Sequence, residues 1–177
     1  MPAIKQRDLP TLSQLQLNVP QRTKLSPMQT ITGNRFDLVL ACQPNAGDNY
    51  PLYNDIFDTF ENEKNLRIYS PHKDVEANRH TMEDTVIFTV REAIPRTKGV
   101  LVHLSSVTPE IQKMFDSTYL NSRPFILFYS ADINPFSINT ERIIKADPCF
   151  RGEIKYWNEP DAIRQLSKKY NDLFKTI

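Results

Sequence analysis

The heptapeptide IYSPHKD, residues 68–74, places a hydroxyl, an imidazole and a carboxylate around one proline. Ser70 and His72 could hydrogen-bond a phosphate or a base, and Asp74 could orient the imidazole or act itself in acid–base catalysis. The same residues could instead close a strand, with His72 satisfying the backbone around Pro71. The sequence alone leaves both interpretations open.

Polar groups also gather in two other segments. Gln43, Asn45 and Tyr50 follow one apolar run, and amides and an aromatic ring suit the edge and the face of a nucleobase. Ser105 and Glu110 follow another apolar run. The structural alternatives are a solvated turn for the first segment and, for Glu110, an acid favoured by the helix dipole directly after Thr-Pro.

The remaining histidines and the cysteines point to no further chemistry. No spacing among the three histidines resembles a metal site, and His103 lies in an apolar run where a buried ring with a backbone partner is expected. Neither GxGxxG nor GxxxxGK[ST] occurs, so the sequence predicts no cofactor and no glycine-rich phosphate loop. Cys42 and Cys149 form no CxxC pair, and we expect two free thiols.

The elements that must position these residues alternate regularly after Arg35. Apolar runs predict strands, and helical periods predict helices between them; the strands are expected at 36–42, 66–69, 99–104, 123–129 and 153–157, the helices at 50–63, 82–94, 109–121 and 160–174. This alternation predicts an α/β fold, a doubly wound (Rossmann- or flavodoxin-like) parallel sheet of about five strands with helices on both faces. Ligands of such sheets bind outside the carboxyl ends of the strands, so we expect the three polar segments to converge in one cleft.

The order of segments resembles the nucleoside 2-deoxyribosyltransferase family over roughly residues 36–129. The similar stretches are LVLACQP, YSPHKD, GVLVHLSS, PEIQKMFDSTYL and NSRPFILFYS. The resemblance implies a Rossmann-like domain that binds a nucleoside or nucleotide and reacts at its N-glycosidic bond. In that family a glutamate on the helix after the third strand attacks the anomeric carbon.

The acids that the resemblance implies are not matched. Met114 stands at the position of the glutamate, and Ser105 and Val90 stand where two other acids are expected. Glu110, one helical turn before Met114, is the best remaining nucleophile. The other acids that could serve are Glu83, Asp84 and Asp116.

Three functions follow from these observations. The first is an enzyme that cleaves or transfers at an N-glycosidic bond; the second is a non-catalytic nucleotide-sensing module that keeps the cleft. The third is a TIR-like interaction module, because that fold shares the parallel sheet. Fold alone does not decide among them.

Composition sets the domain organisation and the class of partner. The 22 basic and 21 acidic residues leave a net charge of +1, which implies no general affinity for nucleic acids or membranes. No apolar run reaches the roughly 18 residues of a membrane span and no secretory segment begins the chain, so a cytoplasmic protein is expected. Residues 1–34, rich in proline and weakly periodic, predict an extended arm that wraps over the domain or reaches a partner, including a second copy; disorder is the alternative. Residues 35–177 predict a single α/β domain.

Overall fold

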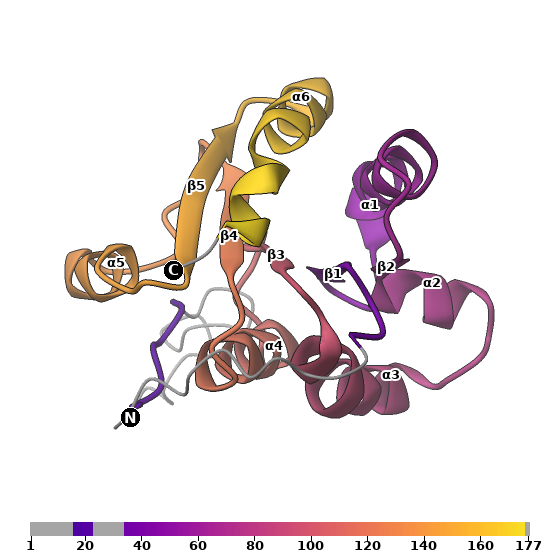
Figure 1. The fold of residues 1–177 in the computed structure, drawn as a ribbon, viewed down its shortest axis with the longest axis horizontal. Helices are drawn as coiled ribbons and strands as arrows, with labels where there is room; N and C mark the ends of the chain where they lie inside the picture. The colour runs from indigo at the N-terminus through magenta and orange to yellow at the C-terminus, as the bar shows by residue number, and fades with distance from the viewer. Residues whose placement is uncertain (1–15, 23–33, 176–177) are drawn as a thin grey trace, which may run out of the picture.

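The sheet of this protein is parallel throughout, as the sequence predicts. The computed structural model describes residues 16–22 and 34–175 (Figure 1). Five strands form one sheet in the order β2-β1-β3-β4-β5, and every neighbouring pair is parallel. The strands are β1 (Leu38–Ala41), β2 (Ile68–Tyr69), β3 (Val100–His103), β4 (Phe125–Ser130) and β5 (Phe150–Tyr156).

Helices cover both faces of the sheet. The helices are α1 (Tyr50–Asp58), α2 (Pro71–Glu76), α3 (Met82–Phe88), α4 (Pro109–Leu120), α5 (Ile138–Lys145) and α6 (Glu159–Lys169). Wider turns of π type continue α1 over Thr59–Glu63 and α3 over Thr89–Ala93, and 3-10 turns cover Gly47–Asn49, Ile94–Arg96 and Tyr170–Phe174. In Figure 1, α1 and α6 lie on one side of the sheet, and α3 and α4 lie on the other.

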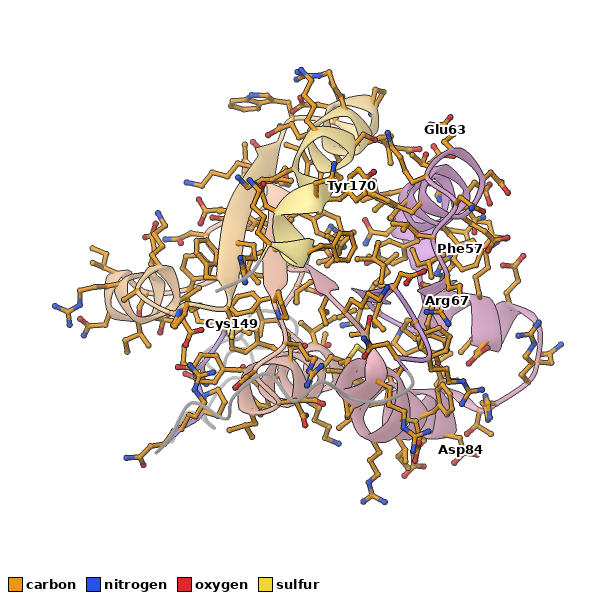
Figure 2. The ribbon with its side chains drawn as sticks, in the orientation of Figure 1. Phe57, Glu63, Arg67, Asp84, Cys149 and Tyr170 are labelled. Carbon is orange, nitrogen blue, oxygen red and sulfur yellow. The ribbon has the colours of Figure 1, made fainter. Side chains whose placement is uncertain are left out.

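The sheet separates two apolar cores. Leu38 and Leu40 point into the core beneath α1 and α6, whereas Val39 and Ala41 point into the core beneath α3, α4 and α5. Side chains fill the space between sheet and helices on both sides (Figure 2). Burial on both faces explains why the strands are continuous apolar runs rather than alternating ones.

Two local features differ from the expected elements. The polar stretch after β2 is the short helix α2, because Ser70 is extended and Pro71 fits the first helical position. Helix α5, which the sequence analysis did not predict, begins after Ser137, whose side chain accepts a hydrogen bond from the backbone N–H of Thr140. It has only eight residues, fewer than the about 11–18 over which a helical period is recognised, and only Ile144 is buried.

Residues 16–22 pack against their own domain. Leu17 is buried, and its N–H donates to the carbonyl of Pro135 at 2.8 Å. The Gln112 amide accepts from the N–H of Asn18 and donates to its carbonyl, at 2.9 and 2.7 Å. Arg22 pairs with Asp147. The rest of the predicted arm, residues 1–15 and 23–33, lies outside the described residues.

Two expectations about composition are also met within the described ranges. Neither residues 16–22 nor residues 34–175 contain a helix both long and apolar enough to cross a bilayer. Cys42 and Cys149 are free thiols, and both are buried.

Candidate functional site

A groove of about 720 Å³ opens between α3 and α4, at the edge of the sheet that is formed by the carboxyl ends of its strands. The loop after β1 forms one wall, and the two helices form the others; the lining residues are Gln43, Pro44, Asn45, Met82, Glu83, Val86, Ile87, Val90, Arg91, Glu110 and Lys113. In a sheet of order 2-1-3-4-5 the strand order reverses between β1 and β3, because β2 is added beyond β1 on one side and β4 and β5 beyond β3 on the other. Ligands of such sheets bind outside the carboxyl ends of these two strands, and the groove lies there.

The groove combines an apolar floor with charges of both signs. Val86 and Val90 pack partly against the core, while Ile87 is 42% exposed. Glu83 and Glu110 contribute carboxylates from α3 and α4. Arg91, in the π-type turn that continues α3, and Lys113, within α4, contribute cations. Such a surface can hold a ligand that has a flat apolar part, polar edges and a charged group.

Local capping fixes where the two helices of the groove begin. The Thr81 hydroxyl accepts from the N–H of Asp84 at 3.1 Å, and the Thr108 hydroxyl accepts from the N–H of Ile111 at 3.3 Å. The Gln43 side-chain amide also donates to the Thr108 hydroxyl. The loop after β1 is therefore tied to the first turn of α4, which carries Glu110.

The structure brings some of the predicted site residues together and leaves others elsewhere. Gln43, Asn45 and Glu110 line the groove, together with Glu83. Tyr50, Ser70, His72, Asp74 and Ser105 are not among the lining residues. Of the other acids considered, Asp84 also lies off the groove, and Asp116 accepts from the Gln112 amide at 2.7 Å.

Ser70 and His72 belong to a buried polar chain. The Cys42 thiol lies 3.5 Å from the Ser70 hydroxyl, which contacts Nδ1 of His72, and Nε2 of His72 lies 2.9 Å from Oδ1 of Asn54. Burial lowers the pKa of His72 to about 4, so the ring is neutral at pH 7. A neutral ring that donates from Nε2 to Asn54 accepts at Nδ1 from Ser70.

The buried network of Cys42, Ser70 and His72 does not have the properties of a nucleophilic triad. Cys42, Ser70 and His72 are all at most 2% exposed. Burial also raises the pKa of the Cys42 thiol to about 12, which removes the thiolate. This buried side-chain network instead links the ends of β1 and β2 to α1.

Asp74 is turned toward the other side of α2. Its carboxylate accepts from the Tyr69 hydroxyl at 2.8 Å and lies 3.7 Å from Arg79 and 3.5 Å from His80. Asp74 lies only two residues after His72 in the sequence, but the partners of the imidazole are Ser70 and Asn54. Asp74 thus holds α2 against β2 and the chain leading to α3.

Tyr50 and Ser105 also make contacts within the domain. The Tyr50 hydroxyl donates to Glu76 at 2.6 Å, and its ring meets the ring of His72 edge-on. The Ser105 hydroxyl accepts from the Asn49 amide at 3.4 Å. Tyr50 thus connects the start of α1 to the end of α2, and Ser105 connects the loop after β3 to Asn49, directly before α1.

His103 forms a second buried chain with two tyrosines. Its Nδ1 and Nε2 lie 2.7 Å from the hydroxyls of Tyr53 and Tyr156, and its ring stacks on Phe128 with centroids 4.6 Å apart. The prediction of a backbone partner for His103 was wrong, because tyrosines from α1 and β5 reach both ring nitrogens. Burial lowers the pKa of His103 to about 3, so this ring is neutral as well.

Met114 is a core residue. Its side chain is fully buried on the inner face of α4, next to Phe115. The position that the family resemblance assigns to the attacking glutamate therefore faces the apolar core, one turn away from the groove-lining Glu110.

The sequence analysis missed part of the groove. The sequence did not point to Met82, Ile87, Arg91 or Lys113 as groove residues. The available signal was the adjacent pair Val86 and Ile87, since two neighbouring positions are about 100° apart on a helix and cannot both face the core squarely.

A second hollow, of about 530 Å³, lies between α1 and α6 and is mainly acidic. Its lining includes Asp55, Asp58, Glu63 and Glu159; Glu63 is labelled in Figure 2. A hydrogen bond with Asp55 raises the pKa of Glu159. Within residues 16–22 and 34–175, however, no group of three or more histidine, cysteine, aspartate or glutamate side chains is arranged to hold a metal ion.

The chain matches no protein-family model, no curated protein and no solved structure. The fold and the geometry of the groove are consequently the basis for assigning a function.

Proposed function

We propose that the groove between α3 and α4 binds a nucleoside or a nucleotide. One observation carries the proposal: the groove lies at the carboxyl ends of β1 and β3 and joins amides, an apolar floor and charges of both signs in about 720 Å³. Small-molecule sites have volumes of about 300–1,000 Å³ and consist of apolar walls with a few polar groups.

Each part of a nucleotide has a counterpart in the lining. The amides of Gln43 and Asn45 suit the donor and acceptor edge of a base, and Val86 and Val90 suit its face. Glu83 and Glu110 can accept hydrogen bonds from sugar hydroxyls. Arg91, in the π-type turn after α3, and Lys113, one turn after Glu110 on α4, can hold a phosphate without a glycine-rich loop.

A second candidate function is cleavage or transfer at the N-glycosidic bond. The observation that favours it is the presence of two carboxylates, Glu83 on α3 and Glu110 on α4, on facing walls of one groove. Glycosyl transfer uses such a pair, because one carboxylate attacks or activates water while the other moves the proton. The buried Met114 favours the binding module instead.

Binding is tested by titrating the protein with nucleosides and nucleoside monophosphates while recording amide chemical shifts. We expect shift changes centred on Asn45, Val86 and Glu110. Lys113→Glu should weaken nucleotide binding at least about tenfold, because a phosphate would then face a carboxylate. Lys168→Glu is the matched control, since Lys168 is an equally exposed lysine on α6, on the opposite face of the sheet.

Catalysis is tested separately by measuring the release of free base. A catalytic role predicts that Glu110→Gln lowers turnover by several orders of magnitude while nucleotide binding changes little. Binding without any release of base by the wild type would assign the non-catalytic function. Unchanged shifts along the groove at millimolar ligand would overturn the binding proposal itself.

A further inference from the structure

Strand β5 has one free edge among the described residues. It pairs only with β4, and with seven residues, Phe150–Tyr156, it is the longest strand of the sheet. The opposite edge strand, β2, has two residues. A long edge presents unpaired N–H and C=O groups that can pair with another chain.

The hydrogen bonds of β5 show which backbone groups face outward. The Tyr156 carbonyl accepts from the N–H of Ala131 at 2.9 Å, so the backbone of Tyr156 faces β4. Backbone groups alternate in direction along a strand, and those of Glu153 and Lys155 therefore face away from the sheet. The Gln165 amide, which reaches the Lys155 carbonyl at 3.0 Å from α6, is consistent with this direction.

The two residues whose backbones face outward carry opposite charges. Within one copy the Glu153 carboxylate, on a side chain that is 15% exposed, lies 3.7 Å from the Lys155 amine, so a pair across two copies shares these charges. When a second copy runs antiparallel with Ile154 opposite Ile154, Glu153 lies opposite Lys155 of the second copy, and Lys155 lies opposite its Glu153. Both members of each pair face outward, which is the requirement for a hydrogen-bonded antiparallel pair. Opposite charges directly across two strands stabilise such a pair, and like charges destabilise it.

Exposed apolar surface lies at the end of the same strand. Trp157 directly follows β5 and is 76% exposed. Tryptophan is among the residue types that contribute most to protein interfaces. In the antiparallel arrangement it extends toward the beginning of the partner strand, so both ends of the paired edge would gain a contact.

We propose that two copies of this protein associate through their β5 edges, antiparallel about Ile154, into one continuous sheet. The interface is isologous, and the symmetry axis passes between the two Ile154 residues. The groove at β1 and β3 stays open. The proposal is independent of the proposed function, because it concerns assembly through a different edge of the sheet.

Gln165 limits the strength of the association. Its amide already donates to the Lys155 carbonyl. A carbonyl oxygen has two lone pairs, so a second donor can still bind, but the Gln165 side chain must shift or share the site. The edge alone is also smaller than the interface of a stable dimer, so a dissociation constant of about 10–100 μM is expected.

The test is sedimentation of the full chain between low and high micromolar concentration, with charge variants. The wild type should shift from monomer to dimer. Lys155→Glu, at a side chain that is 56% exposed, should weaken dimerisation at least about fivefold, because it faces Glu153 of the second copy. The double variant Glu153→Lys with Lys155→Glu should restore the dimer, and Gln165→Ala should strengthen it. Lys113→Glu, at an exposed lysine on α4, away from β5, is the matched control and should leave the dimer unchanged.

Amide hydrogen exchange provides a second measurement that does not depend on variants. Exchange at Glu153 and Lys155 should slow as the protein concentration rises, whereas exchange at Ile154, whose backbone faces β4, should stay constant. A monomer at all concentrations would overturn the proposal. A dimer that is insensitive to Lys155→Glu, or that is not restored in the double variant, would overturn it equally.

Discussion

Two regions of the molecule, one on each face of the sheet, use polar residues in opposite ways. On the face of α1 and α6, histidines, tyrosines, a serine and a cysteine form buried chains with short contacts, such as the 2.7 Å contacts of His103 with two tyrosines. On the face of α3 and α4, ordinary charged and amide side chains line an open groove. The residues that are chemically most distinctive in the sequence are therefore the ones that are closed off from solvent.

This difference shows that residue type alone is a poor guide to the site. A buried histidine must be neutral and hydrogen-bonded, and partners that satisfy it also remove it from reaction with a ligand. A glutamate or lysine that lines a groove keeps its charge in contact with water, so it can bind a ligand. Variants in each region should consequently change different properties.

The largest expected effect is on stability, in the buried chain of His103. His103→Ala removes a fully buried ring and leaves the hydroxyls of Tyr53 and Tyr156 without this partner. We expect the free energy of unfolding to fall by about 3–5 kcal/mol in urea titrations. Lys113→Ala, at the groove, should change it by no more than about 0.5 kcal/mol. Similar small losses for both variants would contradict the comparison.

The next effect is a loss of stability on acidification. The pKa values of His72 and His103 are lowered from 6.5 to about 4 and about 3 in the folded protein. Below pH 6.5 the unfolded chain binds protons that the folded protein does not, so stability is full above pH 6.5 and falls as the pH decreases toward 4. Each histidine contributes a slope of up to about 1.4 kcal/mol per pH unit.

Chemical denaturation at several pH values between 7.5 and 5 measures this slope. His72→Gln should reduce this slope, because it removes one of the two buried rings. An unfolding free energy that is constant over this range would show that the two rings are solvated.

A smaller effect is expected at Ser70. Ser70→Ala removes the hydroxyl between Cys42 and His72 and leaves Nδ1 of His72 without its donor. We expect a loss of about 1–2 kcal/mol in the free energy of unfolding, with unchanged nucleotide binding. A large loss of binding with little loss of stability would return Ser70 to the ligand site.

The smallest effect on stability is expected in the groove, at Ile87. This side chain is 42% exposed, so Ile87→Ser should change the free energy of unfolding by no more than about 0.5 kcal/mol. Because Ile87 lines the groove, the same variant should weaken nucleotide binding several-fold in calorimetric titrations. The reverse result, a destabilised protein with unchanged binding, would assign Ile87 to the core.

The sequence predicted the fold better than the site. The runs at Val100–His103 and Phe125–Ser130 are apolar at every position except their last, and only a strand covered on both faces needs that pattern. Helix α5 was not predicted, because its eight residues are fewer than the about 11–18 over which a helical period is recognised. Among the residues that line the groove, Gln43, Asn45 and Glu110 were expected in a cleft from their places after strands. Ser70 and His72 follow a strand as well, but they point into the domain.

The sequence by itself determined the parallel sheet, because strands buried on both faces are continuous apolar runs. It thereby also determined the edge of the sheet, at the carboxyl ends of the strands, where the groove lies. Tertiary structure alone decided which polar side chains reach that edge. The direction of a side chain after a strand depends on the turn that follows, and at Pro71 that turn is a helix that carries His72 beneath Tyr50 and beside Asn54. The groove itself exists only because α3 and α4, which are separated in sequence by β3, lie next to each other on one face of the sheet.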